Sequence, residues 1–309
     1  MSPQNPSVFD LAQPSARSKT VRAQRTLTIE PLAETVGAEV HGVDADQLAG
    51  DDDGGLAAAI LAALEANGVL VFRGLHLAPE AQVAFCRRLG EVDESAPNHP
   101  VAGIYLVSLD KAKNKSADYL HGTFHWHIDG CTPDGDECPQ MATVLTANVV
   151  AEAGDGGETE FASTYAAYDE LADDEKARLA PLRVRHTLEA SQRKVHPDPT
   201  GEQLAGWRRR KTSVHPLVWT HRDGRRSLVL GASADHVTGG GIGLDEGRAL
   251  LDDLLARATR PERVYRHSWS VGDTVIWDNR GVLHRAVPYD PTSPREMLRT
   301  TVLGDEPIQ

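Results

Sequence analysis

The chain has 309 residues, 40% of them hydrophobic, which is enough for one large domain or two small ones with a substantial core. Its 32 basic and 45 acidic residues give a formal net charge of −13, which argues against nucleic acid or an anionic membrane as the main partner but still allows a local basic pocket for an anion. Three cysteines provide no disulfide framework, and no stretch approaches the roughly 20 apolar residues that cross a bilayer, so we expect a cytoplasmic protein.

The first part of the chain predicts a short tail followed by a helix-bearing flank. Residues 1–25 contain arginines but lack the apolar segment of a secretory signal, so we expect a mobile tail. The flank, residues 26–100, should hold two strands, two helices and one buried strand between the helices. The predicted elements are a strand pair in Leu27–Val43, a helix from Asp52 or Asp53 to Ala66, a strand at Val69–Phe72 and a helix from Pro79 that Gly90 ends.

From about residue 100 the pattern changes to short strands with turn signals, which favours a sandwich or a barrel. Two helices should interrupt the strands, at Tyr165–Ala180 and Leu244–Thr259. We predict one domain over residues 26–309, with its core in 101–309. The predicted core strands are Ile104–Leu109, Phe124–Asp129, Ala142–Val150, Val184–Glu189, Ser213–Thr220, Ser227–Leu230, Val264–Ser270, Thr274–Trp277, Gly281–Ala286 and Arg295–Leu303.

Two histidines and one aspartate form the most informative pattern in the sequence. His127 and Asp129 lie two residues apart, so on a strand both side chains would point to one face, and His284 would join them from another strand. Two imidazoles and a carboxylate can occupy one face of an octahedral metal and leave three positions open, which suits iron(II) that binds a chelating acid and dioxygen. Arg295 and Arg299 follow, and a guanidinium there could grip a carboxylate with two hydrogen bonds.

Other interpretations of the same region are open. His121, His125 and His127 could form a zinc site with Cys131 and Cys138, but these cysteines are seven residues apart and lack the close spacing of a zinc knuckle. The polar loop between the cysteines would overhang the site and shape substrate choice, or be a solvated surface loop. Residues 154–157 lack the lysine and Ser/Thr of a phosphate-binding loop, so we interpret them as a turn.

Five segments resemble one family, the iron(II)- and 2-oxoglutarate-dependent dioxygenases that include taurine dioxygenase and dichlorophenoxyacetate dioxygenase. Together they cover nearly all of the chain after about residue 25. Two further stretches, His215–His221 and Ala234–Val237, are more similar to the dichlorophenoxyacetate branch. The five segments are Leu27–Asp44, Gly68–Gly74, Trp126–Asp129, Gly156–Ser163 with Ala166–Asp169, and Val271–His284 with Arg295, Arg299 and Gly304-Asp305.

The resemblance implies an α+β, mainly β fold, in which a double-stranded β-helix (jelly-roll) core carries flanking helices. It implies iron(II) held by His127, Asp129 and His284, with 2-oxoglutarate and dioxygen as cosubstrates. Thr159 and Arg295 would hold the distal carboxylate of 2-oxoglutarate. Arg299 would lie near its C1 carboxylate or near an anionic group of the substrate. Asn98, His99 and Thr123 are expected near the substrate. Because Asp129 is present, the resemblance also argues against a halogenase.

The expected activity is oxidation, above all hydroxylation, of a C–H bond in a small organic, anionic substrate, with release of succinate and carbon dioxide. Desaturation or oxidative decarboxylation by the same iron chemistry is the first alternative. The second is a cupin-like metal-binding protein that is not an oxygenase, which would leave Arg295 and Thr159 without a purpose. The sequence leaves a homo-oligomer open and does not identify the substrate.

Overall fold

The computed structural model describes residues 27–50, 55–95, 98–131 and 138–309. The predicted tail, the helix cap at Asp52 or Asp53, and the interior of the loop between Cys131 and Cys138 lie outside the described residues. Helices and strands are mixed along the chain, and the largest element is a strand-rich sheet, as the sequence predicts.

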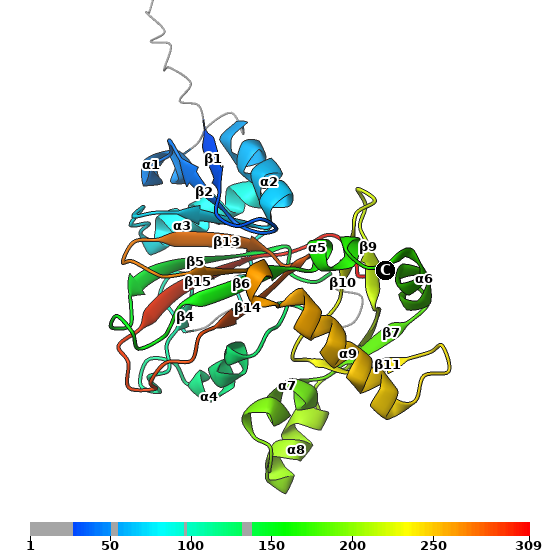
Figure 1. The fold of residues 1–309 in the computed structure, drawn as a ribbon. Coiled ribbons are helices and arrows are strands. Elements are labelled where there is room, and N and C mark those ends of the chain that lie inside the picture. Colours follow the sequence, from blue (N-terminus) through cyan, green and yellow to red (C-terminus); the bar gives the residue numbers. More distant parts are fainter. Residues whose placement is uncertain (1–26, 51–54, 96–97, 132–137) are drawn as a thin grey trace, which may run out of the picture.

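The large sheet has seven strands and takes members from both ends of the chain (Figure 1). Its neighbours are antiparallel except β2 and β3, which are parallel. In spatial order the strands are β1 (Thr28–Pro31), β2 (Ala38–His41), β3 (Val69–Phe72), β13 (Thr274–Asp278), β5 (Ala142–Val149), β15 (Glu296–Val302) and β4 (Tyr105–Val107).

Helices cover one face of this sheet and a second sheet covers the other, so β3 is buried on both faces and is apolar at every position. Leu70 and Phe72 point toward the helices, whereas Val69 and Val71 point to the opposite face, so both faces of the strand are buried. The predicted stripe of the third helix is confirmed, with Val83, Cys86 and Leu89 buried. The helices are α1 (Ala45–Ala49), α2 (Gly55–Asn67) and α3 (Pro79–Leu89).

A three-stranded sheet lies against the other face of the large sheet. Phe161 of this sheet packs on Trp277 of β13, with 5.5 Å between ring centroids. The apolar layer between the sheets also contains Leu145 of β5 and Val275 of β13. The small sheet consists of β12 (Val264–His267), β6 (Thr159–Ser163) and β14 (Val282–Ala286), with β6 in the centre.

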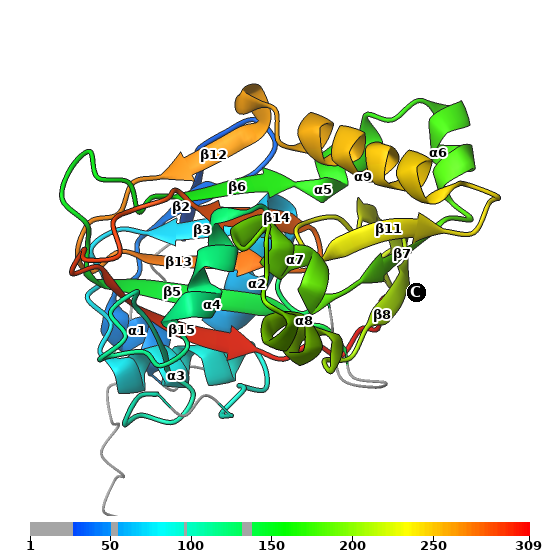
Figure 2. The ribbon, with the colours of Figure 1, turned by 90° about the horizontal axis from the view of Figure 1, so that it is seen from below.

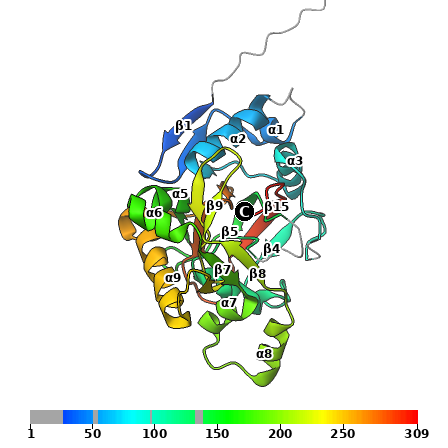
Figure 3. The same ribbon diagram turned by 90° about the vertical axis from the view of Figure 1, so that its right-hand side faces the viewer.

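The remaining elements lie beside the sheets (Figures 2 and 3). Many of them share an apolar cluster with Ala162 of β6 and Leu283 of β14. Helix α9 lies along β11 and buries Leu251 and Leu254. The C-terminal carbonyl of Gln309 accepts a hydrogen bond from Thr220 in β9. These elements are α5 (Thr164–Asp169), α6 (Asp173–Leu179), β7 (Arg183–His186), α7 (Leu188–Val195), α8 (Gly201–Arg208), β8 (Ser213–Pro216), β9 (Val218–Thr220), β10 (Arg226–Leu228), β11 (Ala234–Thr238) and α9 (Leu244–Ala258). Short helices α4 (Ala117–Leu120), η1 (His121–Phe124) and η2 (Pro261–Arg263) complete the structure.

One predicted strand is wrong. Phe124–Asp129 forms no regular strand: η1 ends at Phe124, only His127 pairs with another strand residue, and the chain then turns at Gly130, whose φ is +79°. A left-handed φ at that glycine ends any extended run.

Several predicted elements are shorter or divided, and three of them show why. The helix predicted at Tyr165–Ala180 is two helices, because the chain is extended at Ala172 (φ −65°, ψ 153°). The strand from Val184 ends at His186, since Thr187 caps α7 through its hydroxyl. The strand predicted at 213–220 is two strands, β8 and β9, in different sheets. Strand β11 and helices α7 and α8 were not predicted as elements.

None of the described helices has the length and apolar character needed to cross a membrane.

Candidate active site

The structure brings His127, Asp129 and His284 together. One ligating atom from each side chain lies within 4.8 Å of the others. The Nε2 atom of His127 is 3.8 Å from Oδ1 of Asp129, and Nε2 of His284 is 3.7 Å from Oδ2. Among the described residues, no other group of three His, Cys, Asp or Glu side chains meets in this way, and the zinc cluster considered from the sequence does not form there.

A single backbone bridge sets the two histidines side by side. His127 donates its amide to the carbonyl of His284 at 3.0 Å, and His284 donates back at 2.9 Å, so their rings lie 4.1 Å apart between centroids. Gly231 passes behind this bridge so closely that a Cβ there would lie 2.9 Å from Cα of His127. The next amide, of Ala232, donates to the carbonyl of Trp126 at 2.7 Å.

The protonation states of this group suit a metal. Nδ1 of His127 lies 2.9 Å from the carbonyl oxygen of His125, which can only accept, so Nδ1 carries the proton and Nε2 keeps its lone pair. Burial, with help from His127, holds the pKa of His284 well below its usual value, so this ring is neutral. Burial would raise the pKa of Asp129, but the charge of Arg299 and the hydrogen bond from Thr143 oppose this effect and the pKa is lowered. The carboxylate is therefore ionised.

A buried guanidinium lies at the other end of the same pocket. Arg295 is 3% exposed, donates from Nε to the carbonyl of Gly157 at 3.1 Å and lies over the ring of Tyr289 at 4.9 Å. No ion pair within 4.0 Å joins it to a carboxylate of the described residues, and burial lowers its pKa although Tyr289 and the more distant Glu158 act in the opposite direction. A buried cation without an anion is costly, so this place favours a carboxylate ligand. Thr159 begins β6 after the turn predicted at residues 154–157.

One pocket is lined by the candidate metal-binding group and also by Arg295 and Thr159. Thr123 is in its wall, whereas Asn98 and His99 are not. The side chain of Asn98 makes two hydrogen bonds with the backbone of Leu106, and Nδ1 of His99 accepts from the amide of Val101. The lining residues are Val107, Leu120, Thr123, His127, Asp129, Leu145, Thr159, Trp277, His284, Ala286, Tyr289, Arg295 and Arg299.

Sequence reasoning missed several residues of this site. Tyr289 lines the pocket and Trp269 supports it, because Nε1 of Trp269 donates to the hydroxyl of Thr159 at 3.0 Å. The apolar wall of Val107, Leu120 and Leu145 was not singled out either. Single aromatic and aliphatic residues carry no spacing that marks a site, so only the pairing of the strands reveals them.

Residues 28–301 match the family model described as "Taurine catabolism dioxygenase TauD, TfdA family". The chain belongs to this family. A similar relative is the (S)-phenoxypropionate/alpha-ketoglutarate-dioxygenase of Sphingobium herbicidovorans, 37% identical over 285 residues that cover 90% of this chain and 95% of the relative. Another is the alpha-ketoglutarate-dependent 2,4-dichlorophenoxyacetate dioxygenase of Cupriavidus pinatubonensis, 36% identical over 91% of this chain and 99% of the relative.

Solved structures agree with this assignment. The crystal structure of AAD-2 in complex with Mn(II) and N-oxalylglycine superposes with a TM-score of 0.76 at 34% identity, covering 92% of this chain and all of that one (100%). A taurine dioxygenase from Burkholderia xenovorans gives 0.70 at 29% identity, covering 91% of this chain and 90% of the other. The protein is a 2-oxoglutarate-dependent dioxygenase that uses iron(II) and dioxygen, and the alternative of a non-oxygenase metal-binding protein is excluded.

Proposed function

We propose that this dioxygenase hydroxylates a C–H bond of a small organic acid in the pocket between Asp129 and Arg295. The observation that carries the proposal is that a two-histidine, one-carboxylate group and a buried arginine without a carboxylate partner open into one pocket. A dicarboxylic acid could reach both: one end at the metal and the other at the guanidinium.

The donor set fits iron(II). His127, Asp129 and His284 would hold it, since both imidazoles offer Nε2 and the carboxylate is ionised. When bound, iron(II) couples the oxidative decarboxylation of 2-oxoglutarate to the oxidation of a C–H bond. The protein's part is to position the reactants, and His284 and Trp277 are two buried residues that line the pocket.

Arg295 and Thr159 would bind the distal carboxylate of 2-oxoglutarate. The guanidinium of Arg295 is held by Gly157 and lies beside the hydroxyl of Tyr289 at 3.5 Å. Thr159 accepts the indole N–H of Trp269, so its own hydroxyl proton is free to donate to a carboxylate. Three groups thus converge on one end of the cosubstrate.

The substrate would be an acid with an apolar body. Val107, Leu120 and Leu145 give the pocket an apolar wall, and Arg299 is the pocket cation beside the metal-binding group. Similar relatives are named for phenoxypropionate, dichlorophenoxyacetate and sulfate ester. The competing role for Arg299 is to bind the C1 carboxylate of 2-oxoglutarate. Thr123 would contact the substrate, whereas Asn98 and His99 would act through the loop they stabilise.

We infer a double-stranded β-helix for the two facing sheets, in line with the similar dioxygenase structures. We also propose one domain over residues 26–309, since β1, β2 and β3 share a sheet with the C-terminal strands. The three free cysteines support a cytoplasmic location, and a homo-oligomer is compatible with the proposal.

A substrate screen tests the function. Anaerobic protein loaded with iron(II) and 2-oxoglutarate would be given oxygen and a panel of aryloxy and alkyl acids, each beside its methyl ester or amide. Succinate release and oxygen uptake would be followed together. We expect stimulation by some acids and little by their neutral partners. Equal stimulation by the neutral partners would reject an anionic substrate, and metal binding retained in Asp129→Ala and His284→Ala would reject the ligand assignment.

A further inference from the structure

We propose that Thr143 and Asn279 are positioning residues that hold Oδ2 of Asp129 and so fix the orientation of this carboxylate for the metal. The inference rests on the proposed role of Asp129 as a metal ligand. The hydroxyl of Thr143 lies 2.9 Å from Oδ2 of Asp129, and Nδ2 of Asn279 lies 3.0 Å from that hydroxyl oxygen. Both supporting side chains are fully buried, at 0% exposure.

The direction of these two hydrogen bonds follows from chemistry. The amide N–H of Asn279 can only donate, so the hydroxyl oxygen of Thr143 must accept it. The one hydroxyl proton of Thr143 is then directed at the carboxylate, which can only accept. Asn279 therefore acts on Asp129 through Thr143, although it does not contact the carboxylate itself.

The same carboxylate oxygen has a second partner. Nη2 of Arg299 lies 3.4 Å from Oδ2 of Asp129 and donates to Oε1 of Gln140 at 3.0 Å. Oδ2 therefore lies near a hydroxyl and a guanidinium, and Nε2 of His284 is 3.7 Å from it, whereas Oδ1 lies 3.8 Å from Nε2 of His127. A carboxylate held in this way has little freedom to rotate, so it would keep one orientation toward the two histidines.

The turn that carries Asn279 is firmly anchored. The backbone N–H of Asn279 donates to the carbonyl of Met141 at 2.9 Å, and Met141 directly precedes β5, the strand that contains Thr143. The preceding residue, Asp278, is fully buried and forms a two-pronged ion pair with Arg280, at 2.8 and 3.1 Å. Ser227 donates to the carbonyl of Arg280 at 2.9 Å.

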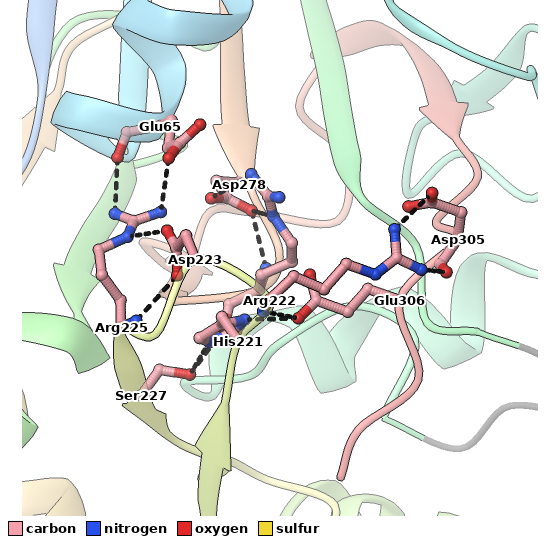
Figure 4. Close-up of polar contacts among 10 residues, drawn as sticks. Glu65, His221, Arg222, Asp223, Arg225, Ser227, Asp278, Asp305 and Glu306 are labelled. Carbon is pink, nitrogen blue, oxygen red and sulfur yellow. Dashed lines mark hydrogen bonds and ion pairs between the residues drawn. The ribbon is translucent and has the colours of Figure 1, made fainter.

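The contacts that hold this turn continue through Ser227 to the C-terminal segment of the chain. Figure 4 shows His221 between Ser227 and Glu306, with Nε2 at 2.8 Å from the serine hydroxyl and Nδ1 at 3.6 Å from the carboxylate. The amide of Arg222 donates to the same carboxylate at 2.8 Å. The position of Asn279 is thus fixed by packing on two sides, which is what a positioning residue requires.

The test compares substitutions of nearly equal shape. Thr143→Val removes the hydroxyl, Thr143→Ser keeps it, and Asn279→Asp replaces the donor by a group that accepts. Thr146→Val is the matched control, because Thr146 is a buried threonine on the same strand whose hydroxyl bonds to Thr274 at 2.9 Å and not to the site. Cobalt(II) alone is the probe, with its dissociation constant and visible spectrum measured, and thermal unfolding of each metal-free variant is followed in chelator.

We expect Thr143→Val to weaken cobalt(II) binding by about 10- to 100-fold and to change the visible bands, as loss of a group that supports a metal ligand does. Asn279→Asp should follow in the same direction, and Thr143→Ser and Thr146→Val should stay near the wild type. Binding by Thr143→Val within about twofold of wild type, or failure of Thr143→Ser to restore it, would overturn the inference. If Thr143→Val is unfolded, the Asn279→Asp and Thr143→Ser pair decides in the same way. Absence of cobalt(II) binding by the wild type would instead reject the metal site itself.

Discussion

The indole nitrogen of Trp269 donates to the hydroxyl oxygen of Thr159 at 3.0 Å, and so orients a residue at the proposed cosubstrate carboxylate. We predict that Thr159→Val raises the KM for 2-oxoglutarate by about tenfold or more, because a hydrogen bond to a charged group contributes about 1.5–3 kcal/mol. Trp269→Phe should raise it less, since the threonine hydroxyl remains. Thr159→Ser should keep a KM near the wild type. Steady-state kinetics at saturating substrate would measure this, and an equal KM in Thr159→Val would remove Thr159 from the binding site.

Arg295 should dominate the binding of 2-oxoglutarate. Arg295→Leu is expected to weaken it by about 2–5 kcal/mol, because it deletes one partner of a desolvated ion pair. Arg295→Lys should recover part of this, as an ammonium group cannot make the planar two-pronged contact. Arg222→Leu, at an exposed arginine, is the control. Titration of 2-oxoglutarate into the anaerobic metal-loaded protein gives the affinities. An unchanged affinity in Arg295→Leu would place the distal carboxylate elsewhere.

Gly231 should be needed for its small size as well as for its backbone angle. Its φ is +123°, and an added Cβ would lie 2.9 Å from Cα of His127. Gly231→Ala should therefore destabilise the fold and displace His127, a proposed metal ligand. Gly224→Ala is the control, because Gly224 also has a positive φ, +87°, but has nothing within 4 Å of an added Cβ. Urea unfolding of both variants would measure the loss of stability, and cobalt(II) binding would measure the effect of displacing His127. Similar metal affinity in both variants would contradict the steric argument.

His186 should make the fold less stable in mild acid. Burial, with a smaller effect of His215, lowers the pKa of His186 to about 3. In the unfolded chain the pKa of a histidine is near 6.5. Below that pH His186 is therefore protonated in the unfolded state but still neutral in the folded state. The stabilising contribution is complete above pH 6.5 and falls as the pH drops, by about 2 kcal/mol at pH 5.

The substitution His186→Gln should remove this part of the pH dependence, because glutamine is neutral throughout. The measurement is the free energy of unfolding in urea at pH 6.5 and pH 5, with His41→Gln at a half-exposed histidine as the control. Equal losses in the wild type and His186→Gln would show that His186 is not the group responsible.

Sequence patterns predicted the elements whose burial follows a regular period. Val69–Phe72 and Leu244–Ala258 are correct because apolar residues fill one or both faces of each element. The prediction failed at Phe124–Asp129, where the structure depends on one bridge between His127 and His284. A contact between residues this distant in sequence leaves no local periodicity.

In the candidate site, too, some residues could be predicted from the sequence and others depend on contacts between distant segments. The ligand triad and the two arginines could be proposed from residue type and order, since few side chains bind iron or grip a carboxylate. Trp269 could not, because it reaches Thr159 only through the pairing of His267 with Thr159 between β12 and β6. Asn98 and His99 have the right residue types, yet their side chains bond to nearby backbone.

The parallel pairing of β2 with β3 and the antiparallel pairing of β3 with β13 make the N-terminal flank a structural partner of the large sheet. Shortening the chain to begin after Phe72 would leave β13 with a bare row of amides and carbonyls along Thr274–Trp277. Such an exposed edge recruits strands from other molecules. Shortened forms should therefore aggregate through this edge. A peptide with the sequence of β3 should pair with β13 and keep the shortened protein soluble.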